Sequence, residues 1–463
     1  MDEFMSDEER LALRKFESMM QSNKVYFFDS EEFEEIVYHY MDVGKMNLAN
    51  KAIDLSLSQH PTSIPLKLIK VELLVFENKL KLAEKLLTVI QSEDPNFDEI
   101  YIQKASILSK SDDHKGAIEQ LYTALELTND LVDVHSLLGM EFLFIEDFTK
   151  AISHFSECLT IDIEDYAALY NIIYCYDMLD ENEKAISFLN NYIDENPYSE
   201  IAWHQLGRQY LTLNKYHEAI RAFDYAILID ELFIGAYLEK GKALEAIEKY
   251  EEAISNYMVT LKLDDPTAFT YLQIAGCYEQ LKNDKLAINY AQKSVDEDPL
   301  LDQAWLMLTN LYMENDDLQK ALHYIQKALE VDSENTDFLN RFAEINIRLN
   351  LFEEAALAFK KSIFLGDKRL VIYLALADVL HFIGEFNEVN EVLLDTLKLF
   401  PNAAEVHYRL AGIYFILRKE VDAILFLEKA LKLNFAYQSI AEHIYPEMFL
   451  RDDVKTLIAK FKS

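Results

Sequence analysis

The amino-acid sequence predicts an all-α protein in which pairs of antiparallel helices stack one on another as a solenoid. Alanine returns every 34 residues along most of the chain, and a fixed period of this length is typical of stacked helical repeats. Apolar residues recur at spacings of three and four, which is the pattern of amphipathic helices. Ten glycines and eight prolines in 463 residues are too few for an all-β or low-complexity chain. The alanines that share the register, which is broken only by Val389, are Ala49, Ala83, Ala117, Ala151, Ala185, Ala219, Ala253, Ala287, Ala321, Ala355 and Ala423.

The 34-residue period sets the boundaries of the repeating unit. Counted from Ser30, twelve units fit without insertion, so we expect tandem repeats over residues 30–437. In the sixth unit the apolar spacing predicts a first helix, helix A, from Glu200 to about Leu213, and a second, helix B, from about Tyr216 to Leu228. A small side chain is needed where two helix backbones approach closely, which explains the recurring alanine.

The turns between the predicted helices repeat as well. The fifteenth position of the unit, between helix A and helix B, is Asn, Asp or Gly in eight of the twelve units, and these residues tolerate a left-handed backbone. A proline recurs near the end of five units and marks the step from helix B to the next helix A, since proline favours the first turn of a helix. These prolines are Pro61, Pro95, Pro197, Pro299 and Pro401.

The side chains within one unit resemble those of the tetratricopeptide repeat family. The order is a bulky residue, a Leu-Gly or Leu-Ala pair, Tyr, Ala, an aromatic residue and Ala. The sixth unit shows it as Trp203, Leu206, Gly207, Tyr210, Ala219, Phe223 and Ala226. The resemblance covers about nine-tenths of the chain and implies a right-handed superhelix, in which the A helices line a concave groove and the B helices lie outside. Val37, Val71 and Ile173 depart from it at the small-residue position, and looser or shifted packing is expected there.

Two segments lie outside the predicted repeats. Residues 1–29 form an acidic N-terminal segment, and its spaced apolar residues, from Leu11 to Met20, predict a capping helix over the first repeat. Residues 438–463 are expected to supply capping helices at the other end, because an open repeat exposes apolar surface. The alternative is that either segment is an interaction tail.

Charge and cysteine content restrict the partners and the compartment. The formal net charge is −37, from 81 acidic and 44 basic side chains, which disfavours nucleic acid and anionic membranes as partners. The acidity serves either solubility or attraction of basic partners. Three unpaired cysteines fit a reducing cytoplasm. The acidic start does not resemble a secretory signal, and no stretch approaches the roughly 20 apolar residues of a membrane helix.

The usual signatures of catalysis, cofactors and metals are missing from the sequence. The closest two of eleven histidines are 13 residues apart, and there is no Cys-x-x-Cys pair for zinc or redox chemistry. No two glycines lie within five residues of each other, so a nucleotide-binding loop cannot be written. We therefore expect no catalytic, cofactor-binding or metal-binding residue, and the cysteines are interpreted as small packing residues.

The resemblance also implies where a partner would bind. In such repeats the second, fifth, sixth, ninth, twelfth and thirteenth positions of each unit face the groove. The predicted peptide-binding residues, from the fourth to the seventh unit, are Met140, Tyr170, Asn171, Tyr174, His204, Gln205, Arg208, Glu239 and Lys242. Tyr170 and Tyr174 would pack apolar side chains, and Arg208 and Lys242 would pair with a carboxylate. The alternative is that these residues are ordinary solvated groove residues.

Binding of a chaperone's C-terminal carboxylate, which some family members perform, is not expected. That site needs basic and Asn side chains in three successive units. The nearest match is Asn310 followed by Arg341. It fails in the next unit, where Val371 and Ala375 stand at the positions that need basic residues.

The sequence thus predicts a non-enzymatic scaffold that binds a peptide or helix of a partner protein. Two alternatives stay open: a structural subunit that forms homo-oligomers, and a substrate-recruiting arm for an enzyme on another chain. The identity of the partner does not follow from the sequence, because one fold serves many functions.

Overall fold

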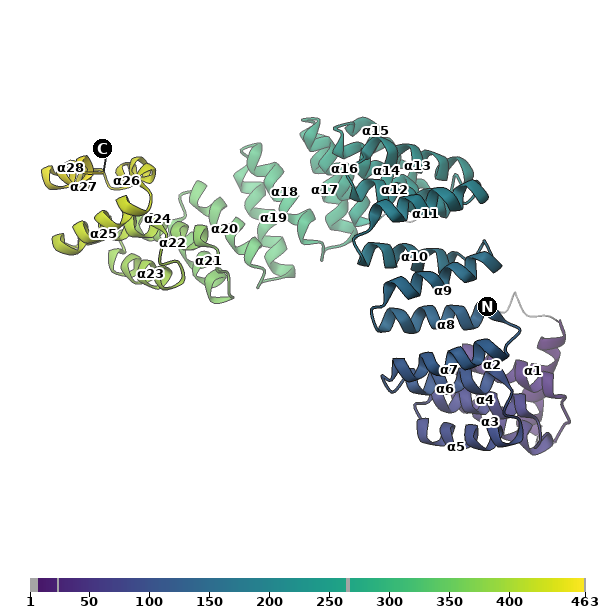
Figure 1. Cartoon of the computed structure of the whole chain (residues 1–463). Helices are drawn as coiled ribbons and strands as arrows, with labels where there is room; N and C mark the ends of the chain where they lie inside the picture. Colours follow the sequence, from purple (N-terminus) through teal and green to yellow (C-terminus); the bar gives the residue numbers. More distant parts are fainter. Residues whose placement is uncertain (1–6, 23–24, 264–266, 462–463) are drawn as a thin grey trace. The chain divides into compact units, whose positions relative to one another are not determined.

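The computed structural model describes residues 7–22, 25–263 and 267–461, and this part of the chain contains helices and turns but no strand (Figure 1). The chain divides into two compact units, Met1–Glu231 and Leu232–Ser463, which are considered separately here. Within each unit every helix packs against the next one along the chain. The all-α class and the stacking of helices as an α-solenoid are therefore confirmed.

The first unit contains thirteen helices in its described residues. They are α1 (Asp7–Ser22), α2 (Ser30–Asp42), α3 (Met46–Gln59), α4 (Ile64–Phe76), α5 (Leu80–Glu93), α6 (Asp98–Ser109), α7 (His114–Leu127), α8 (Leu131–Phe144), α9 (Phe148–Ile161), α10 (Tyr166–Met178), α11 (Asn182–Glu195), α12 (Glu200–Thr212) and α13 (Tyr216–Ile229). Helices α12 and α13 confirm the pair predicted for the sixth unit to within one residue at each end. We call the even-numbered helices α2 to α24 the A helices and the odd-numbered helices α3 to α25 the B helices.

The second unit continues the alternation and ends in shorter helices. They are α14 (Ile234–Ala246), α15 (Tyr250–Leu263), α16 (Ala268–Gln280), α17 (Asp284–Glu297), α18 (Asp302–Glu314), α19 (Leu318–Val331), α20 (Thr336–Arg348), α21 (Phe352–Phe364), α22 (Leu370–Phe382), α23 (Phe386–Leu399), α24 (Ala404–Ile416), α25 (Glu420–Leu433), the 3-10 turn η1 (Phe435–Tyr437), α26 (Gln438–Ile444), α27 (Pro446–Phe449) and α28 (Asp452–Ala459). None of the helices in the described ranges has the length and apolarity that crossing a bilayer requires.

The turn from each A helix to its B helix uses one residue in the left-handed region. The predicted left-handed conformation is confirmed at Asn214, where φ is 56°, and at Asp180, where φ is 55°. Glu146, Glu248 and Lys282 adopt the same conformation with φ between 57° and 61°, although their side chains do not favour it. The repeated geometry of the helix pair therefore overrides the preference of the single residue.

Aromatic side chains explain why the small-residue position exists. A Cβ atom added to Gly207 would lie 2.4 Å from the ring of Phe223, and one added to Gly139 would lie 2.6 Å from the ring of Phe155. The ring of a B helix thus occupies the space that a side chain on the A helix would need. A glycine on the A helix and a ring on the B helix form a matched pair.

The expected loosening at the three departures from the pattern is not found. Val37, Val71 and Ile173 are all buried in the cores of their helix pairs. The residue 16 positions later, where Phe223 follows Gly207, is aliphatic in each of these three units. In these three units a larger residue on the A helix thus occurs together with an aliphatic residue, and not a ring, on the B helix. The three aliphatic residues are Ile53, Leu87 and Leu189.

The recurring prolines lie just before the A helices rather than in their first turn. Pro197 and Pro299 are in the short connections that precede α12 and α18. Their carbonyl oxygens accept hydrogen bonds from the indole nitrogens of Trp203 at 3.0 Å and Trp305 at 2.8 Å. The bulky residue of the repeat therefore fastens the turn to the helix that follows it.

The N-terminal helix α1 packs on α2, with Phe16 and Met19 buried against Phe28 and Tyr40. This contact is consistent with the proposed capping role of residues 1–29, of which residues 1–6 and 23–24 lie outside the described part of the chain.

Candidate functional site

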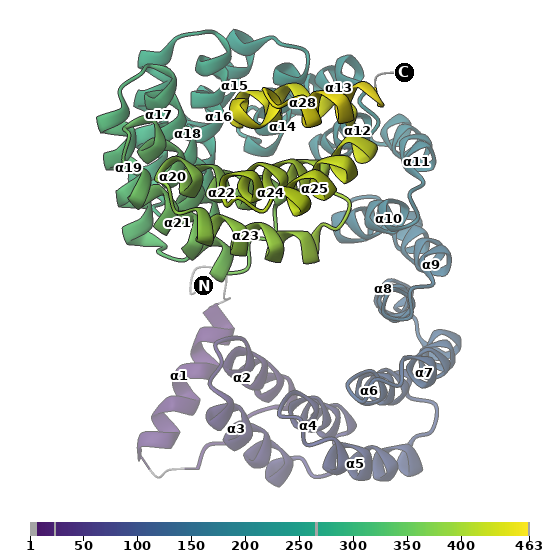
Figure 2. The same ribbon diagram turned by 90° about the vertical axis from the view of Figure 1, so that its left-hand side faces the viewer.

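The A helices have one face that does not pack against the B helix of the same pair, and we call it the inner face. It carries the second, fifth, sixth, ninth, twelfth and thirteenth positions of each unit. Figure 2 shows α2, α4 and α6 one after another, and α4 packs against both α2 and α6. The inner faces of these neighbours, followed by those of α8 and α10, form the candidate surface of the first unit.

Helices α8 and α10 expose a set of large apolar side chains on this face. They follow one another at spacings of three or four residues, so each helix presents a continuous ridge. Each side chain is between 37% and 57% exposed. We call these residues the apolar face: Leu137, Met140, Phe144, Tyr170, Tyr174 and Met178.

The apolar face is not needed to hold the two helices in place. Helix α8 buries Val134, Leu138 and Phe142 on its other side, and α10 buries Leu169 and Ile172. A surface helix normally places polar residues opposite its buried stripe. Clustered exposed apolar residues on a folded protein mark sites of interaction.

Phe144, at the end of the α8 ridge, packs against His114 of α7, which is itself hydrogen-bonded to Glu141. The ring of His114 stacks on the Phe144 ring with centroids 4.9 Å apart. The Nδ1 atom of His114 lies 2.9 Å from Oε2 of Glu141, one helical turn before Phe144. This arrangement fixes the orientation of an otherwise exposed aromatic side chain.

The structure places the predicted groove residues of the first unit in two environments. Met140, Tyr170 and Tyr174 belong to the apolar face, and Asn171 beside them is half-buried. On α12, by contrast, Gln205 is buried and accepts a hydrogen bond from the exposed Arg208 at 3.3 Å. His204 packs its ring 5.7 Å from that of Phe223. Helix α12 therefore offers mainly Arg208 to solvent.

Glu239 and Lys242, the remaining predicted residues, lie on α14 in the second unit. Their side chains form an ion pair of 2.8 Å across one helical turn. The ammonium group of Lys242 also lies 5.6 Å from the centre of the Phe269 ring. The proposal that Arg208 and Lys242 hold one carboxylate between them remains a prediction.

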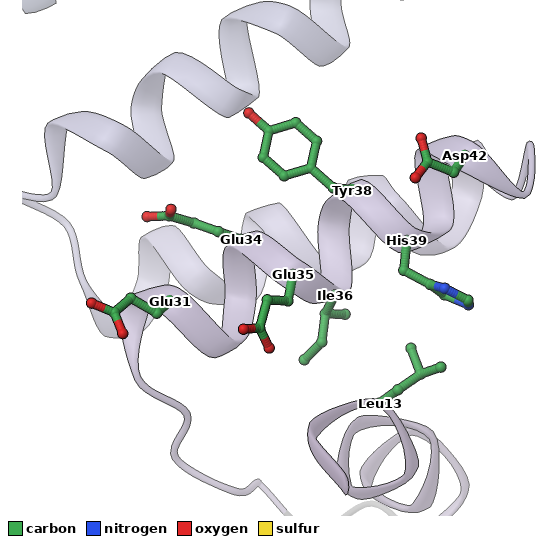
Figure 3. Close-up of a pocket in the computed structure, with 8 residues that line it drawn as sticks. All are labelled: Leu13, Glu31, Glu34, Glu35, Ile36, Tyr38, His39 and Asp42. Carbon is green, nitrogen blue, oxygen red and sulfur yellow. The ribbon is translucent and has the colours of Figure 1, made fainter. Parts of the chain in front are cut away.

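A second feature of the first unit, an acidic inner face at its beginning, was not predicted. Glu31, Glu34, Glu35, Tyr38 and Asp42 of α2 line an open pocket of about 580 Å³, shown in Figure 3. An adjoining pocket of about 300 Å³ runs over α2, α4 and α6. Its floor is apolar and its edge acidic, and its lining includes Leu68, Ile69, Glu72, Phe97 and Glu99. The signal was present in the sequence as carboxylates at groove positions of the first three units.

The carboxylates of this acidic inner face repel one another in a partly desolvated setting. Burial raises the pKa of Glu34, Glu72 and Glu99 above the ordinary carboxyl value. Nearby carboxylates raise these pKa values further: for Glu99 they include Glu72 and Asp133. The hydrogen bond from the Tyr38 hydroxyl to Glu72, of 3.0 Å, acts in the opposite direction but does not cancel the effect of burial.

The inner face at the end of the second unit is covered by the chain itself. Arg409 of α24 is buried and forms a two-pronged ion pair with Asp378 of α22, at 2.6 and 2.7 Å. Its third nitrogen donates to the Tyr437 hydroxyl at 2.7 Å. Tyr445 lies over Gly412, which has no side chain to obstruct it.

The covering buries the middle of this inner face, whereas Val371 and Phe382 at the two ends of α22 stay exposed. The Tyr445 ring is buried, and its centroid lies 4.9 Å from that of His381. Tyr408 is also buried and donates a hydrogen bond to the Asn434 carbonyl at 3.1 Å. Asp378, His381, Tyr408 and Arg409, which occupy groove positions in the sequence, therefore serve internal packing.

The three cysteines are buried, as expected for small packing residues. Burial raises the pKa of Cys158 and Cys175 to about 11, which keeps both thiols protonated and unreactive near neutral pH. Within the described ranges, no three His, Cys, Asp or Glu side chains are grouped so that they could hold a metal ion.

Family models described as tetratricopeptide repeat match five stretches of the chain, at residues 98–131, 167–199, 201–231, 270–299 and 306–368. No curated protein sequence matches the chain. Among solved structures, a tetratricopeptide repeat protein from Parabacteroides merdae is 20% identical, with a TM-score of 0.36, over 60% of this chain and 97% of that one.

Two further solved structures are similar to parts of the chain. YrrB, described as a TPR protein with an unusual peptide-binding site, is 20% identical with a TM-score of 0.33, over 38% of this chain and 92% of its own. A chain of the APC/C hetero-tetramer Cut9-Hcn1 is 17% identical with a TM-score of 0.35, over 89% of this chain and 94% of its own. The sequence models and the stacked helix pairs show that the chain contains tetratricopeptide repeats.

Proposed function

We propose that this protein is a non-enzymatic interaction scaffold that binds a segment of another protein on the inner face of its first unit. Repeats of this family build protein-interaction scaffolds in general. The observation that carries the proposal is the apolar face of α8 and α10, whose six large side chains are each between 37% and 57% exposed.

The chemistry of the apolar face suits a protein segment. Tyr170 and Tyr174 supply contact area while losing little conformational freedom, because each has only two side-chain torsions. Met140 and Met178 adapt their shape to different apolar side chains. Covering a half-exposed side chain of this size contributes on the order of 1 kcal/mol, so six of them can hold a segment with useful affinity.

Polar groups beside the apolar face would set the direction of the bound segment. Asn171 lies between the two tyrosines in sequence and can donate to or accept from a peptide backbone. The exposed Arg208 offers a guanidinium group to a carboxylate of the partner. Glu239 and Lys242 of α14 remain predicted binding residues of the second unit.

Selection from a library of random peptides displayed on phage tests the proposal without knowledge of the natural partner. The full chain is the target, and each selected peptide is measured again on the double variant Met140→Glu, Tyr174→Glu. Charges placed on the apolar face should weaken binding at least about tenfold, because each would be buried without a partner. The control variant is Leu82→Glu, Val89→Glu, which changes two exposed apolar residues of the B helix α5.

Peptides that bind the chain and its control variant, but not the variant of the apolar face, support the proposal. Selected peptides that bind all three proteins equally would contradict it. Self-association is a separate outcome: a dimer in sedimentation that Met140→Glu, Tyr174→Glu abolishes would show that the apolar face binds a second copy of the chain.

A further inference from the structure

The acidic inner face and the apolar face lie on successive A helices of the first unit: α2, α4 and α6 carry the first, and α8 and α10 carry the second. Helices α6 and α8 both pack against α7, so the two faces follow each other along the array. Asp133, near the start of α8, is one of the charges that raise the pKa of Glu99 on α6. A segment bound on α8 that extends toward α6 therefore approaches carboxylates.

We infer that the protein's partner is a segment in which apolar side chains are followed, some residues away along the chain, by lysine or arginine. This inference rests on the function proposed above. The apolar face provides the docking site, and the charge of the neighbouring inner face determines what can occupy it. An acidic or neutral segment extended in this direction would offer no cation to Glu34, Glu72 and Glu99.

Binding a cation should stabilise the carboxylates of the acidic inner face more than it stabilises fully solvated carboxylates. Glu34, Glu72 and Glu99 are partly withdrawn from water, and their hydrogen-bond donors are the neutral groups of Ser30, Tyr38 and Gln103. A bound cation relieves their mutual repulsion and acts in a setting of lowered dielectric constant.

The walls of the two pockets also fit long basic side chains. The ring of Tyr38 is partly exposed beside Glu34, as Figure 3 shows, and a guanidinium can stack on it while pairing with the carboxylate. Leu68 and Ile69 form an apolar floor for the methylene stem of a lysine or arginine. Each pocket thus combines an apolar surface for the stem with carboxylates for the charged end.

Helix spacing gives the separation between the basic residues of the partner segment. Packed helices lie about 8–10 Å apart, so the two steps from α6 through α4 to α2 span roughly 16–20 Å. An extended chain advances about 3.3 Å per residue, so a basic residue paired on α2 lies about five or six residues beyond one paired with Glu99 on α6. The residue paired with Glu99 lies nearer the apolar anchors.

The peptides selected on the apolar face provide the test. Their affinities are compared between the unaltered chain, the triple variant Glu34→Gln, Glu72→Gln, Glu99→Gln, and the control triple variant Glu84→Gln, Glu119→Gln, Glu126→Gln. The control removes the same charge from exposed positions of the B helices α5 and α7. Lysine or arginine should be enriched on one side of the apolar residues in the selected peptides.

Binding of these peptides should weaken about tenfold in the first triple variant, weaken much less in the control, and fall as salt is added. Glutamine keeps the size of each side chain and removes like-charge repulsion, so the triple variant should melt no lower than the unaltered chain. Peptides that need the apolar face but lack basic residues and bind the triple variant unchanged would overturn this inference and leave the proposed function intact. Absence of any peptide that needs the apolar face would overturn both.

Discussion

The inner faces of two pairs of A helices, α8 with α10 and α22 with α24, use the same repeat positions in opposite ways. In the first pair these positions carry apolar side chains that are between 37% and 57% exposed. In the second pair Tyr437 and Tyr445, which follow the last regular helix pair, cover the middle of the face and leave Val371 and Phe382 exposed at its ends. A groove position in the repeat is therefore only a potential binding position, and its neighbours decide whether it is available.

The difference can be traced to a few residues. Gly412 leaves room for the Tyr445 ring to lie across α24, whereas the corresponding residues of α8 and α10, Met140 and Tyr174, carry large side chains. Arg409 then binds Asp378 on one side and Tyr437 on the other. Mutations should accordingly lower the free energy of unfolding more in the covered inner face than in the open one.

The largest difference is expected for tyrosine truncation. Tyr445→Ala should lower the free energy of unfolding of the second unit by about 3 kcal/mol, because it leaves a cavity under a covered face. Tyr174→Ala should cost less than about 1 kcal/mol, since its side chain is half-exposed. Denaturant titration monitored by amide hydrogen exchange resolves the two regions. Equal losses in both would mean that the two inner faces do not differ in burial.

An arginine comparison gives a smaller effect of the same kind. Arg409→Met removes the partner of Asp378, and because that carboxylate is 40% exposed, we expect a loss of about 1–2 kcal/mol. Arg208→Met, on the exposed side of α12, should change stability by no more than about 0.5 kcal/mol. In a linear array both effects should stay near the mutated helices. Loss of protection spread evenly over the whole chain would contradict this expectation.

The smallest effect concerns pH. The raised pKa values of Glu34, Glu72 and Glu99 mean that the folded state binds protons more tightly than the unfolded state at these groups. Their stabilising contribution is therefore present at low pH and is lost as pH rises through the raised values. The Gln triple variant should be more stable than the unaltered chain at neutral pH, and this advantage should shrink as pH falls.

Asp367 in the second unit should respond to acid in the opposite direction. Its hydrogen bonds to Arg369 hold its pKa well below the ordinary carboxyl value, so its contribution is lost as pH falls below that ordinary value. Protection of α2 to α6 and of α20 to α22, measured by hydrogen exchange across the acid range, should therefore diverge. A parallel response of the two regions would contradict the charge arrangement described here.

The sequence predicted the fold in detail, whereas the role of the predicted groove residues in binding stays a prediction. Periodicity located the helices, and the turn position predicted the left-handed residues, because both depend on neighbours within one helix pair. Met140, Tyr170 and Tyr174 were found by their repeat positions. Leu137 and Met178 were overlooked, although the nearly uniform apolar character of α8 and α10 could have revealed them.

The remaining features depend on contacts that a single repeat does not encode. The buried state of Gln205 and the pocket beside Tyr38 arise from neighbouring helices. The covering of α24 requires the chain after Leu433 to turn back so that Tyr445 reaches Gly412. Such contacts join residues of different units, and periodicity carries no information about them.

Amide hydrogen exchange of the full chain, with and without a selected peptide, tests the central claim most directly. If the open apolar face is the binding site, the peptide should slow exchange in α8 and α10 and leave α22 and α24 unchanged. Slowed exchange in α22 to α26 with no change in α8 and α10 would show that the covered inner face, and not the open one, receives the partner.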